Sequence, residues 1–411
     1  MSTFLYAKIL DFFVYFNIIK IILFANSCWR KINNNLYKKQ RNSIMKNLLT
    51  LFSIFIISFF ISACCCNNEI NYSKLSKSSK APVVIVTDYI ENDGKSDVAD
   101  AIQTLIENNP NRTIYFPDGT YLLSHSIKTP ADPKRSVFLK LDNYAILKAS
   151  DNWTEKGAVV RLGGIYPKND ISTNGSYYGI SGGIIDGSGK ANGISIDSGR
   201  ETIIRDISIK NVKIGIHIKR GANNGSSDAD ILGVNLVGTN ELDSIGILTE
   251  GHDNTITNIR AASFVIGVKL NSGGNSLRNV HPLYIYPAKD KLEHHSKSCG
   301  FVDLGGGNWH NFSYCDQFAT AFVLGENPSI LNHCQTFYYS KNVKHQTVIK
   351  NIGKFNSIVT DFRASLSSGD FKKSILDAKK GGKGVFQNLI INCKLPKSDL
   401  VKEHLKGNLI N

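Results

Sequence analysis

The sequence predicts an all-β protein built as a solenoid of parallel strands, and three observations support this. One strand phrase recurs in phase, a second recurs between its copies, and the segment before them has the pattern of a capping helix. The first phrase is a small residue followed by an alternating triplet, and it begins at Gly193, Gly215, Gly246, Gly267, Gly300 and Ala321. Successive copies start 22, 31, 21, 33 and 21 residues apart. A period of about 21 residues is the length of one solenoid coil.

The second phrase places apolar residues around a polar residue and, in most copies, an Asn or Asp. Its copies occupy residues 204–207, 256–259, 277–280, 309–312, 331–334 and 349–352. Asn and Gly tolerate the left-handed backbone of a tight corner, and stacked Asn side chains hydrogen-bond along a stack. Two strand phrases per step therefore predict the coils of a parallel β-helix. The long steps carry extra residues at 221–244 and 282–299, which we expect to form loops on the binding face.

Residues 1–63 are interpreted as a leader outside the fold. The stretch 1–44 is apolar and basic without a globular pattern, and we interpret it as an upstream extension from a wrong start codon. Lys46, an apolar run at 48–60 and the phrase Ile61-Ser-Ala-Cys64 then resemble a bacterial lipoprotein signal peptide. The resemblance implies a lipid anchor on Cys64 that attaches the protein to the bacterial cell envelope, at the outer membrane, facing the periplasm or the cell surface. An uncleaved membrane anchor is the alternative.

The rest of the chain reads as a flexible tether at 64–80 and a single β-helix domain at 81–411. The net charge of the whole chain is +14, and half of that surplus lies in residues 1–63. The remaining excess of positive charge suits an acidic polymer as partner. No basic run is interleaved with aromatic residues, so we do not expect nucleic-acid binding. The sequence leaves the oligomeric state open.

The domain is expected to begin with a capping helix near residues 97–107. Ile102, Leu105 and Ile106 form an apolar stripe at helical spacing. A helix at the open end of a solenoid covers a sheet edge that would otherwise be unpaired. A strand, a Pro-Asp-Gly turn and a second strand follow within 113–123. We expect β-helix coils from there to residue 395.

Three segments resemble the pectate-lyase-like superfamily, which has the pectin lyase fold. They are residues 92–106, where Asn-Asp-Gly precedes the helix, residues 114–121, and the glycine-rich stretch 180–189. The resemblance implies a right-handed single-stranded parallel β-helix over 85–395. It does not imply one chemistry, because this fold hosts lyases, hydrolases, epimerases and phage tail-spike depolymerases. Gly251-His-Asp253 only partly matches the Gly-His-Gly motif of polygalacturonases, whose Asp-Asp and Arg-Ile-Lys motifs are absent, so the subfamily is not placed.

Candidate site residues follow from the side chains that the second phrase is expected to present outward. One outward column is expected to hold Arg205, Thr257, Arg278, His310 and Asn332, and the next Ser208, Asn235, Arg260, His281 and Ser313. Successive coils are about 4.8 Å apart. We therefore expect two Arg and two His side chains to meet on one face, beside the 282–299 loop.

Such a set of side chains suits β-elimination of a uronic acid polymer, and we expect a polysaccharide lyase that acts on an anionic glycan. The reaction removes a proton α to a carboxylate, which Arg neutralises with two hydrogen bonds while His, Lys or Tyr transfers protons. The expected catalytic residues are His281, His310, Tyr286 and Lys269, and the expected substrate-binding residues are Arg260, Arg278, Tyr284 and Tyr314. No cofactor or metal is expected, and Ca²⁺ is left open because no ligand motif identifies a site.

Two other functions are left open. A glycoside hydrolase needs two carboxylates about 5 to 10 Å apart. Asp303 and Asp316 flank the coil of His310 and could form such a pair; the further candidates are Asp243, Glu250 and Asp253. A non-catalytic glycan-binding β-helix needs neither carboxylate.

Trp and Cys give weaker indications. Trp309 is expected to point inward, which leaves few aromatic side chains for stacking on a neutral sugar and favours an anionic one. Cys334 stands at an inward position and reads as plain core. A disulfide between Cys299 and Cys315, outside the cytoplasm, is a further hypothesis.

Overall fold

The computed structural model describes one compact unit within residues 70–411. The described residues are 75, 78–164, 178–220, 226–285, 292–338, 345–353, 357–366, 372–377, 384–387, 390–392 and 409–410. The leader, the proposed lipid site Cys64 and the loop residue Tyr286 lie outside them.

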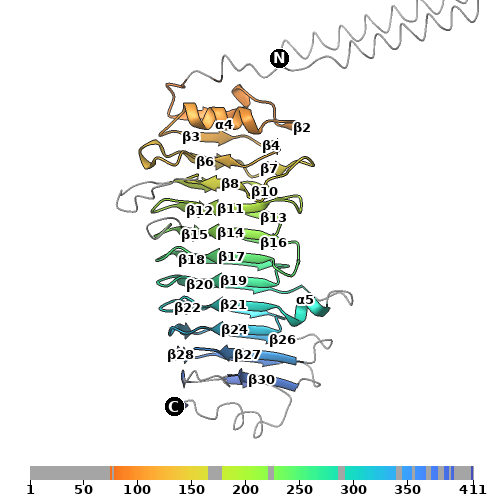
Figure 1. Ribbon diagram of the computed structural model, residues 1–411, viewed down its shortest axis with the longest axis vertical. Helices are drawn as coiled ribbons and strands as arrows, with labels where there is room; N and C mark the ends of the chain where they lie inside the picture. The colour runs from red at the N-terminus through yellow and green to blue at the C-terminus, as the bar shows by residue number, and fades with distance from the viewer. Residues whose placement is uncertain are drawn as a thin grey trace, which may run out of the picture. The chain divides into compact units, whose positions relative to one another are not determined.

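The chain winds into a right-handed parallel β-helix whose coils stack along one axis (Figure 1). Each complete coil gives one strand to a ten-stranded sheet and contributes twice to a 23-stranded sheet. We call the two halves of the larger sheet the first arm and the second arm, in chain order within a coil. Equivalent strands of neighbouring coils pair in parallel, so the fold predicted from the sequence repeat is confirmed.

The strands of the ten-stranded sheet carry the first phrase. They are β5 (Ile127–Lys128), β8 (Ala158–Leu162), β11 (Asn192–Ile196), β14 (Ile214–Ile218), β17 (Ile245–Thr249), β19 (Ile266–Leu270), β21 (Cys299–Asp303), β24 (Thr320–Leu324), β27 (His345–Asn351) and β30 (Lys372–Asp377).

The strands of the larger sheet carry the second phrase. The first arm holds β1 (Val83–Ile85), β3 (Thr113–Phe116), β6 (Phe138–Leu141), β9 (Gly179–Ser181), β12 (Ile203–Arg205), β15 (Asp230–Leu232), β22 (Trp309–Asn311), β25 (Ile330–Asn332), β28 (Ser357–Thr360), β31 (Gly384–Gln387) and β33 (Leu409–Ile410). The second arm holds β2 (Asp93–Asp97), β4 (Gly119–Leu123), β7 (Ala145–Ala149), β10 (Ile184–Asp186), β13 (Ser208–Val212), β16 (Asn235–Gly238), β23 (Tyr314–Asp316), β26 (Gln335–Tyr338), β29 (Arg363–Leu366) and β32 (Ile390–Asn392). Strands β18 (Thr255–Ala262) and β20 (Ser276–Leu283) run through both arms.

Helix α4 (Ala99–Asn108) covers the N-terminal end of the solenoid, where Figure 1 shows it in orange above β3. Its apolar stripe Ile102, Leu105 and Ile106 is fully buried. The predicted capping helix is therefore confirmed. Short 3-10 turns lie at Val86–Asp88 and Pro133–Arg135.

Two corners of the coil are built as the Asn-rich pattern predicts. At the corner between the ten-stranded sheet and the first arm, Asn254 Nδ2 donates to Asn275 Oδ1 at 2.8 Å, and Asn275 Nδ2 donates to Asn308 Oδ1 at 3.1 Å. At the corner between the two arms, one residue has a left-handed backbone in each coil from that of β12 to that of β28, including Asn258 (φ 56°) and Asn279 (φ 52°). Asn279 Nδ2 donates to Asn258 Oδ1 at 2.9 Å. The side chains thus tie successive coils together.

The register of the first arm differs from the sequence prediction at one coil. His310 pairs with Leu277 and Leu331 in the inward column, and Trp309 pairs with Ser276 in the outward one. The phrase at 309–312 is therefore shifted by one residue, which exchanges inward and outward side chains. Trp309 is 43% exposed, so its predicted inward position is wrong. Ile349 pairs with Phe322 and belongs to the ten-stranded sheet.

The extra residues of the two long steps do not form loops throughout. Residues 221–244 include β15 and β16, so only part of that segment is a connection. Residues 282–299 include the end of β20 and the short helix α5 (Leu292–Ser296). Cys299, Cys315 and Cys334 are free thiols, so the predicted Cys299–Cys315 disulfide is wrong. Cys334 is buried, as expected for core.

Candidate functional site

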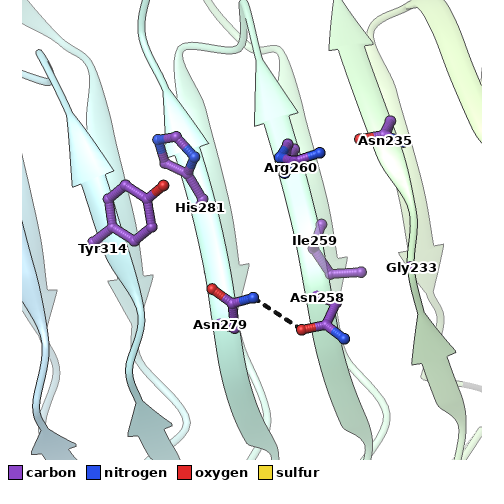
Figure 2. A pocket seen from close by; sticks show the side chains of 8 residues that line it. All are labelled: Gly233, Asn235, Asn258, Ile259, Arg260, Asn279, His281 and Tyr314. Atoms are coloured by element: carbon purple, nitrogen blue, oxygen red, sulfur yellow. Dashed lines mark hydrogen bonds between the residues drawn. The ribbon is translucent and has the colours of Figure 1, made fainter.

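A pocket of about 310 Å³ lies on the outer side of the second arm, where this arm meets the first. It is lined by Gly233, Asn235, Asn258, Ile259, Arg260, Asn279, His281 and Tyr314 (Figure 2). These residues belong to four successive coils. The pocket is therefore a product of coil stacking, which sets equivalent side chains of neighbouring coils about 4.8 Å apart.

Strand register places the polar side chains of the pocket next to one another. Asn235 on β16 pairs with Arg260 on β18, and Arg260 pairs with His281 on β20. Tyr314 on β23 extends this row, because its ring stacks on that of His281 with 3.8 Å between centroids and 20° between planes. Figure 2 shows the four side chains on neighbouring strands.

His281 is held by a carboxylate of the neighbouring coil. Its Nε2 lies 3.2 Å from Asp316 Oδ2, and the two side chains are 18% and 15% exposed. A carboxylate oxygen accepts hydrogen bonds, so we assign the proton to Nε2, which leaves Nδ1 as an acceptor in the neutral ring. The second oxygen, Asp316 Oδ1, is buried and has no hydrogen-bond partner among the described residues.

Tyr314 is a protonated phenol at neutral pH. Burial raises the pKa of its hydroxyl above the ordinary value of 10.0, the charge of Asp316 raises it further, and the Arg260 guanidinium opposes the shift. The pocket thus offers a ring nitrogen that can accept a proton beside a hydroxyl that can donate one.

Four arginines of the two arms lack protein partners. Arg205, Arg260, Arg278 and Arg363 are exposed, and within the described parts of the chain none of their guanidinium groups makes a hydrogen bond or an ion pair. The ten-stranded sheet differs, because Arg161 and Lys219 both bind Asp197, the latter at 2.8 Å. A guanidinium without a protein partner is available to an anionic ligand.

The structure brings together three of the predicted site residues, Arg260, His281 and Tyr314. Arg278 lies on the same strand as His281 but on the first-arm side of the corner, and it does not line the pocket. The predicted column on the second arm is confirmed from Ser208 to His281. It is wrong at Ser313, which is fully buried, and Tyr314 stands in its place beside His281.

Three other predicted positions are wrong. His310 is fully buried inside the solenoid, where its Nε2 lies 2.9 Å from Asp303 Oδ2. Lys269 stands on β19 of the ten-stranded sheet, away from the row that contains His281. Tyr284 is 1% exposed and packs edge-on against Phe318 at 5.7 Å, because the chain turns inward after β20.

Sequence reasoning missed the partner of His281. Asp316 was considered only as one half of a hydrolase pair. It pairs with Leu283, which places it beside His281, but the one-residue shift at 309–312 makes this pairing impossible to predict from the repeat. The available signal was the alternation Tyr314, Cys315, Asp316, in which the buried Cys315 sets both neighbours outward. The exposed Trp309 was missed for the same reason.

Carboxylates are absent from the lining of the pocket. Asp303 is 1% exposed and accepts from Asn308 Nδ2 at 2.7 Å, so it points into the core while Asp316 points outward. The predicted pair of Asp303 and Asp316 therefore cannot flank one glycosidic bond. Among the described residues, no group of three or more His, Cys, Asp or Glu side chains is arranged to hold a metal ion.

Comparisons with known proteins agree with this architecture. Residues 83–285 match the family model described as Rhamnogalacturonase A/epimerase, pectate lyase-like. A mutant tailspike protein of E. coli bacteriophage HK620, in complex with a pentasaccharide, is similar at a TM-score of 0.57 and 13% identity over 75% of this chain and 63% of that one. An endo-xylogalacturonan hydrolase from Aspergillus tubingensis is similar at a TM-score of 0.51 and 14% identity over 77% of this chain and 97% of that one.

A third similar structure is ORF18 of Geobacillus virus E2, at a TM-score of 0.45 and 13% identity over 76% of this chain. The chain spans 58% of the length of that protein. A search of curated protein sequences gives no significant match. The repeat, the two-sheet solenoid and the family match together define a parallel β-helix protein. Residues 83–285 are similar to the pectate-lyase-like family, and the described chain has the parallel β-helix fold of the solved structures that it resembles.

The described part of the chain contains no helix long and apolar enough to cross a membrane.

Proposed function

We propose that the protein is a polysaccharide lyase that cleaves an anionic, uronic-acid-containing glycan by β-elimination at the pocket of Arg260, His281 and Tyr314. One observation carries the proposal: a histidine held by a carboxylate stands between an unpartnered arginine and a protonated tyrosine on adjacent coils. These are the groups that elimination requires, and no carboxylate for hydrolysis lines the pocket.

Arg260 binds the carboxylate of the uronic acid. The proton to be removed is α to that carboxylate, and it becomes acidic only when the negative charge that develops on the carboxylate is stabilised. A guanidinium does this with two parallel hydrogen bonds. Because Arg260 has no partner among the described residues, it is free for the substrate.

His281 takes the proton and Tyr314 returns one to the leaving oxygen. Asp316 holds the Nε2–H of His281, so the opposite nitrogen, Nδ1, is the base. The raised pKa of Tyr314 keeps its hydroxyl protonated and able to donate to the glycosidic oxygen that departs. The C–H bond and the C–O bond break, a C=C bond forms, and water takes no part.

The superfamily supports a carbohydrate-active enzyme in general terms. The tailspike is named with a bound pentasaccharide and the Aspergillus protein as a hydrolase of xylogalacturonan, and we extend to this chain the idea of a glycan partner. The choice of elimination rests on the pocket alone.

Glycoside hydrolysis on the ten-stranded sheet is the second candidate. Asp197 and Glu250 follow β11 and β17, two coils apart, which places them about 10 Å from each other along the axis. That spacing approaches the separation of carboxylates in inverting glycosidases. Both groups are engaged, however: Asp197 accepts from Lys219 and Ser195 at 2.8 and 2.7 Å, and Glu250 lies 2.9 Å from His217.

The chemistry of the product tests the proposal. The purified protein is incubated with a panel of uronic-acid polysaccharides, and both ultraviolet absorbance and new reducing ends are followed. Elimination leaves a conjugated double bond, so absorbance rises with each new end. New ends without absorbance would identify hydrolysis and reject the proposal, and binding without new ends would identify a glycan-binding module.

A matched pair of variants ties the activity to the pocket. Arg260→Ala should lower turnover by about 10² to 10³, the usual cost of removing one group that stabilises developing charge. Lys134→Ala removes an exposed cation near the capping end and should leave turnover unchanged. Equal effects of the two changes would count against a clamp at Arg260.

We also propose that Cys64 carries a lipid anchor, which would hold the enzyme at the cell envelope beside its polymeric substrate.

A further inference from the structure

One coil next to the pocket displays an unusual set of side chains. Trp309 on β22 is 43% exposed and Phe312 at the following corner is 52% exposed, while Tyr314 of the same coil lines the pocket. Phe312 stacks on His333 of the next coil, with 5.1 Å between ring centroids and 28° between planes. We call Trp309, Phe312 and His333 the aromatic platform.

The surface changes character at this coil. Over the three coils before this one, the outward column of the first arm runs through Asp230, Thr255 and Ser276, and from this coil on it runs through Trp309, Ile330 and Ile358. Nearer the N-terminus the same column holds Ile203. The corner column changes in step, from the hydrogen-bonded pair Asn258 and Asn279 to the stacked rings Phe312 and His333. Two neighbouring columns thus switch from polar to apolar between the same two coils.

Exposed Trp and Phe side chains are costly in water unless a ligand covers them. The platform adjoins the pocket, because Phe312 lies two residues before Tyr314 on the same coil and the ring of Tyr314 stacks on that of His281. Amide groups stand beside it, since Asn332 Nδ2 lies 3.4 Å from Asn311 Oδ1 in the neighbouring column of the first arm. Flat apolar rings beside amide groups match a sugar ring, whose faces present C–H groups and whose rim presents hydroxyls.

We propose that the aromatic platform is a subsite for an uncharged pyranose ring, one coil or two beyond the acidic sugar that occupies the pocket. The inference rests on the proposed function for the occupant of the pocket. It names the substrate class more closely: a glycan that carries an uncharged sugar next to a uronic acid along the chain. The arginines then bind the charged sugar and the platform binds the uncharged one.

Tryptophan fluorescence can report binding at this place. The chain has three Trp residues. Trp153 is 7% exposed and Trp29 lies in the leader, so Trp309 is the exposed indole of the described residues. The probes are a chondroitin hexasaccharide, in which a uronic acid alternates with an acetylated amino sugar, cellohexaose, which is neutral, and a hexamer of galacturonic acid, which is acidic throughout.

Full-length wild-type protein should show a change in emission with the chondroitin hexasaccharide and cellohexaose. Phe312→Ala keeps the reporter and should raise Kd for both by about tenfold, which corresponds to about 1.4 kcal/mol. Trp309→Ala should do the same when binding is followed by calorimetry, and Trp309→Phe should restore most of the affinity. None of these changes should alter Kd for the galacturonic acid hexamer by more than about twofold, because an aromatic contact contributes little to a charged ring held by arginine.

Tyr144→Ala is the matched control. Tyr144 is 71% exposed in the turn between β6 and β7, at the same corner but six coils nearer the N-terminus, so Kd should not change. The proposal is overturned if the emission is unchanged with all three probes, or if Trp309→Ala loses affinity equally for all three. It is also overturned if the molecular mass of Trp309→Ala in solution falls below that of the wild type, because a second copy of the chain would then cover the platform. Because no product is measured, these results stand apart from the test for elimination. Retained binding without a conjugated product would reject the lyase and keep the subsite.

Discussion

The buried pair of Asp303 and His310 offers a sharp test of the register found in the structure. Asp303 pairs with Leu270 and Leu324 on neighbouring coils, and His310 pairs with Leu277 and Leu331. The two polar residues therefore interrupt two aliphatic columns at the same level. They satisfy each other through the 2.9 Å contact of His310 Nε2 with Asp303 Oδ2.

Replacing one member of the pair should lower the free energy of unfolding, whereas replacing both should not. Asp303→Leu leaves His310 buried without its acceptor, and His310→Leu leaves the Asp303 carboxylate without its main donor. Loss of one partner of a buried ion pair costs about 3–5 kcal/mol of unfolding free energy. The double variant Asp303→Leu/His310→Leu restores both aliphatic columns, so its stability should equal that of the wild type or exceed it by about 1–4 kcal/mol.

Urea denaturation followed by circular dichroism measures the four proteins, with stability compared through midpoints at a common slope. Turnover on a cleaved glycan is measured in parallel and should persist in the double variant, because His310 lies inside the solenoid. Additive losses in the double variant would refute the pairing. Normal stability of His310→Leu together with lost turnover would restore His310 to the active site.

The remaining predictions concern acid stability, the core, the pocket and the anchor. Burial by itself raises the pKa of Asp303, but hydrogen bonds and the charge of His310 outweigh it and hold the pKa below its ordinary value of 3.8. The stability that this carboxylate contributes is therefore complete above about pH 4 and is lost as the pH falls below it. The wild type should accordingly lose resistance to urea below about pH 4 faster than the double variant does. Leu277→Ala empties a fully buried position and should cost about 2–5 kcal/mol in the same urea assay, against less than about 0.5 kcal/mol for Tyr144→Ala at the surface. Asp316→Asn removes the charge of the group that accepts from His281 Nε2–H, so it should lower kcat by about 10² or more with KM little affected. It also removes a charge that raises the pKa of Tyr314, so the basic limb of the pH profile should move to lower pH, whereas a merely structural residue would lower stability and leave the profile in place. Cys64→Ser should release the protein from pelleted membranes, and unchanged pelleting would argue against the lipid anchor.

The fold was predictable because a solenoid repeats its signal. The phrase at Gly246 and Gly267 recurs on adjacent coils, and each copy supports the others, so the period survives individual deviations. The capping helix was predictable because Ile102, Leu105 and Ile106 form an apolar stripe at helical spacing that has to be buried against the end of the solenoid. Local pattern and global fold agree at these positions.

The register at 309–312 was not predictable from the pattern of apolar residues. Trp309 and Phe312 have the spacing of an inward pair, and a polar residue between them reads as outward. What reverses them is Asp303, which lies six residues before Trp309 and supplies the buried partner that lets His310 point inward. Such compensation between two polar residues leaves no trace in a hydrophobic pattern, and one shifted residue exchanges the two faces of the strand.

The site was predictable in part for a related reason. Arg260 and His281 stand at the same place in consecutive phrases, so their proximity follows from the period. Lys269 shares the period but stands on the other sheet, and the period alone does not say which sheet carries the pocket. That distinction needs the contacts of the cations. Arg161 and Lys219 are paired with Asp197 on the ten-stranded sheet, whereas Arg260 on the second arm has no partner among the described residues.

In the proposed reaction, His281 of the second arm removes the proton from the substrate. The most direct measurement compares turnover of three histidine variants on a glycan that the wild type cleaves: His281→Ala in the pocket, His217→Ala beside Glu250 on the ten-stranded sheet, and His125→Ala beside Asp100 at the capping end. The account predicts a loss of about 10² to 10⁴ in turnover for His281→Ala and near-normal values for the other two. Near-normal turnover of His281→Ala together with a large loss in His217→Ala would contradict it and place the active site on the ten-stranded sheet.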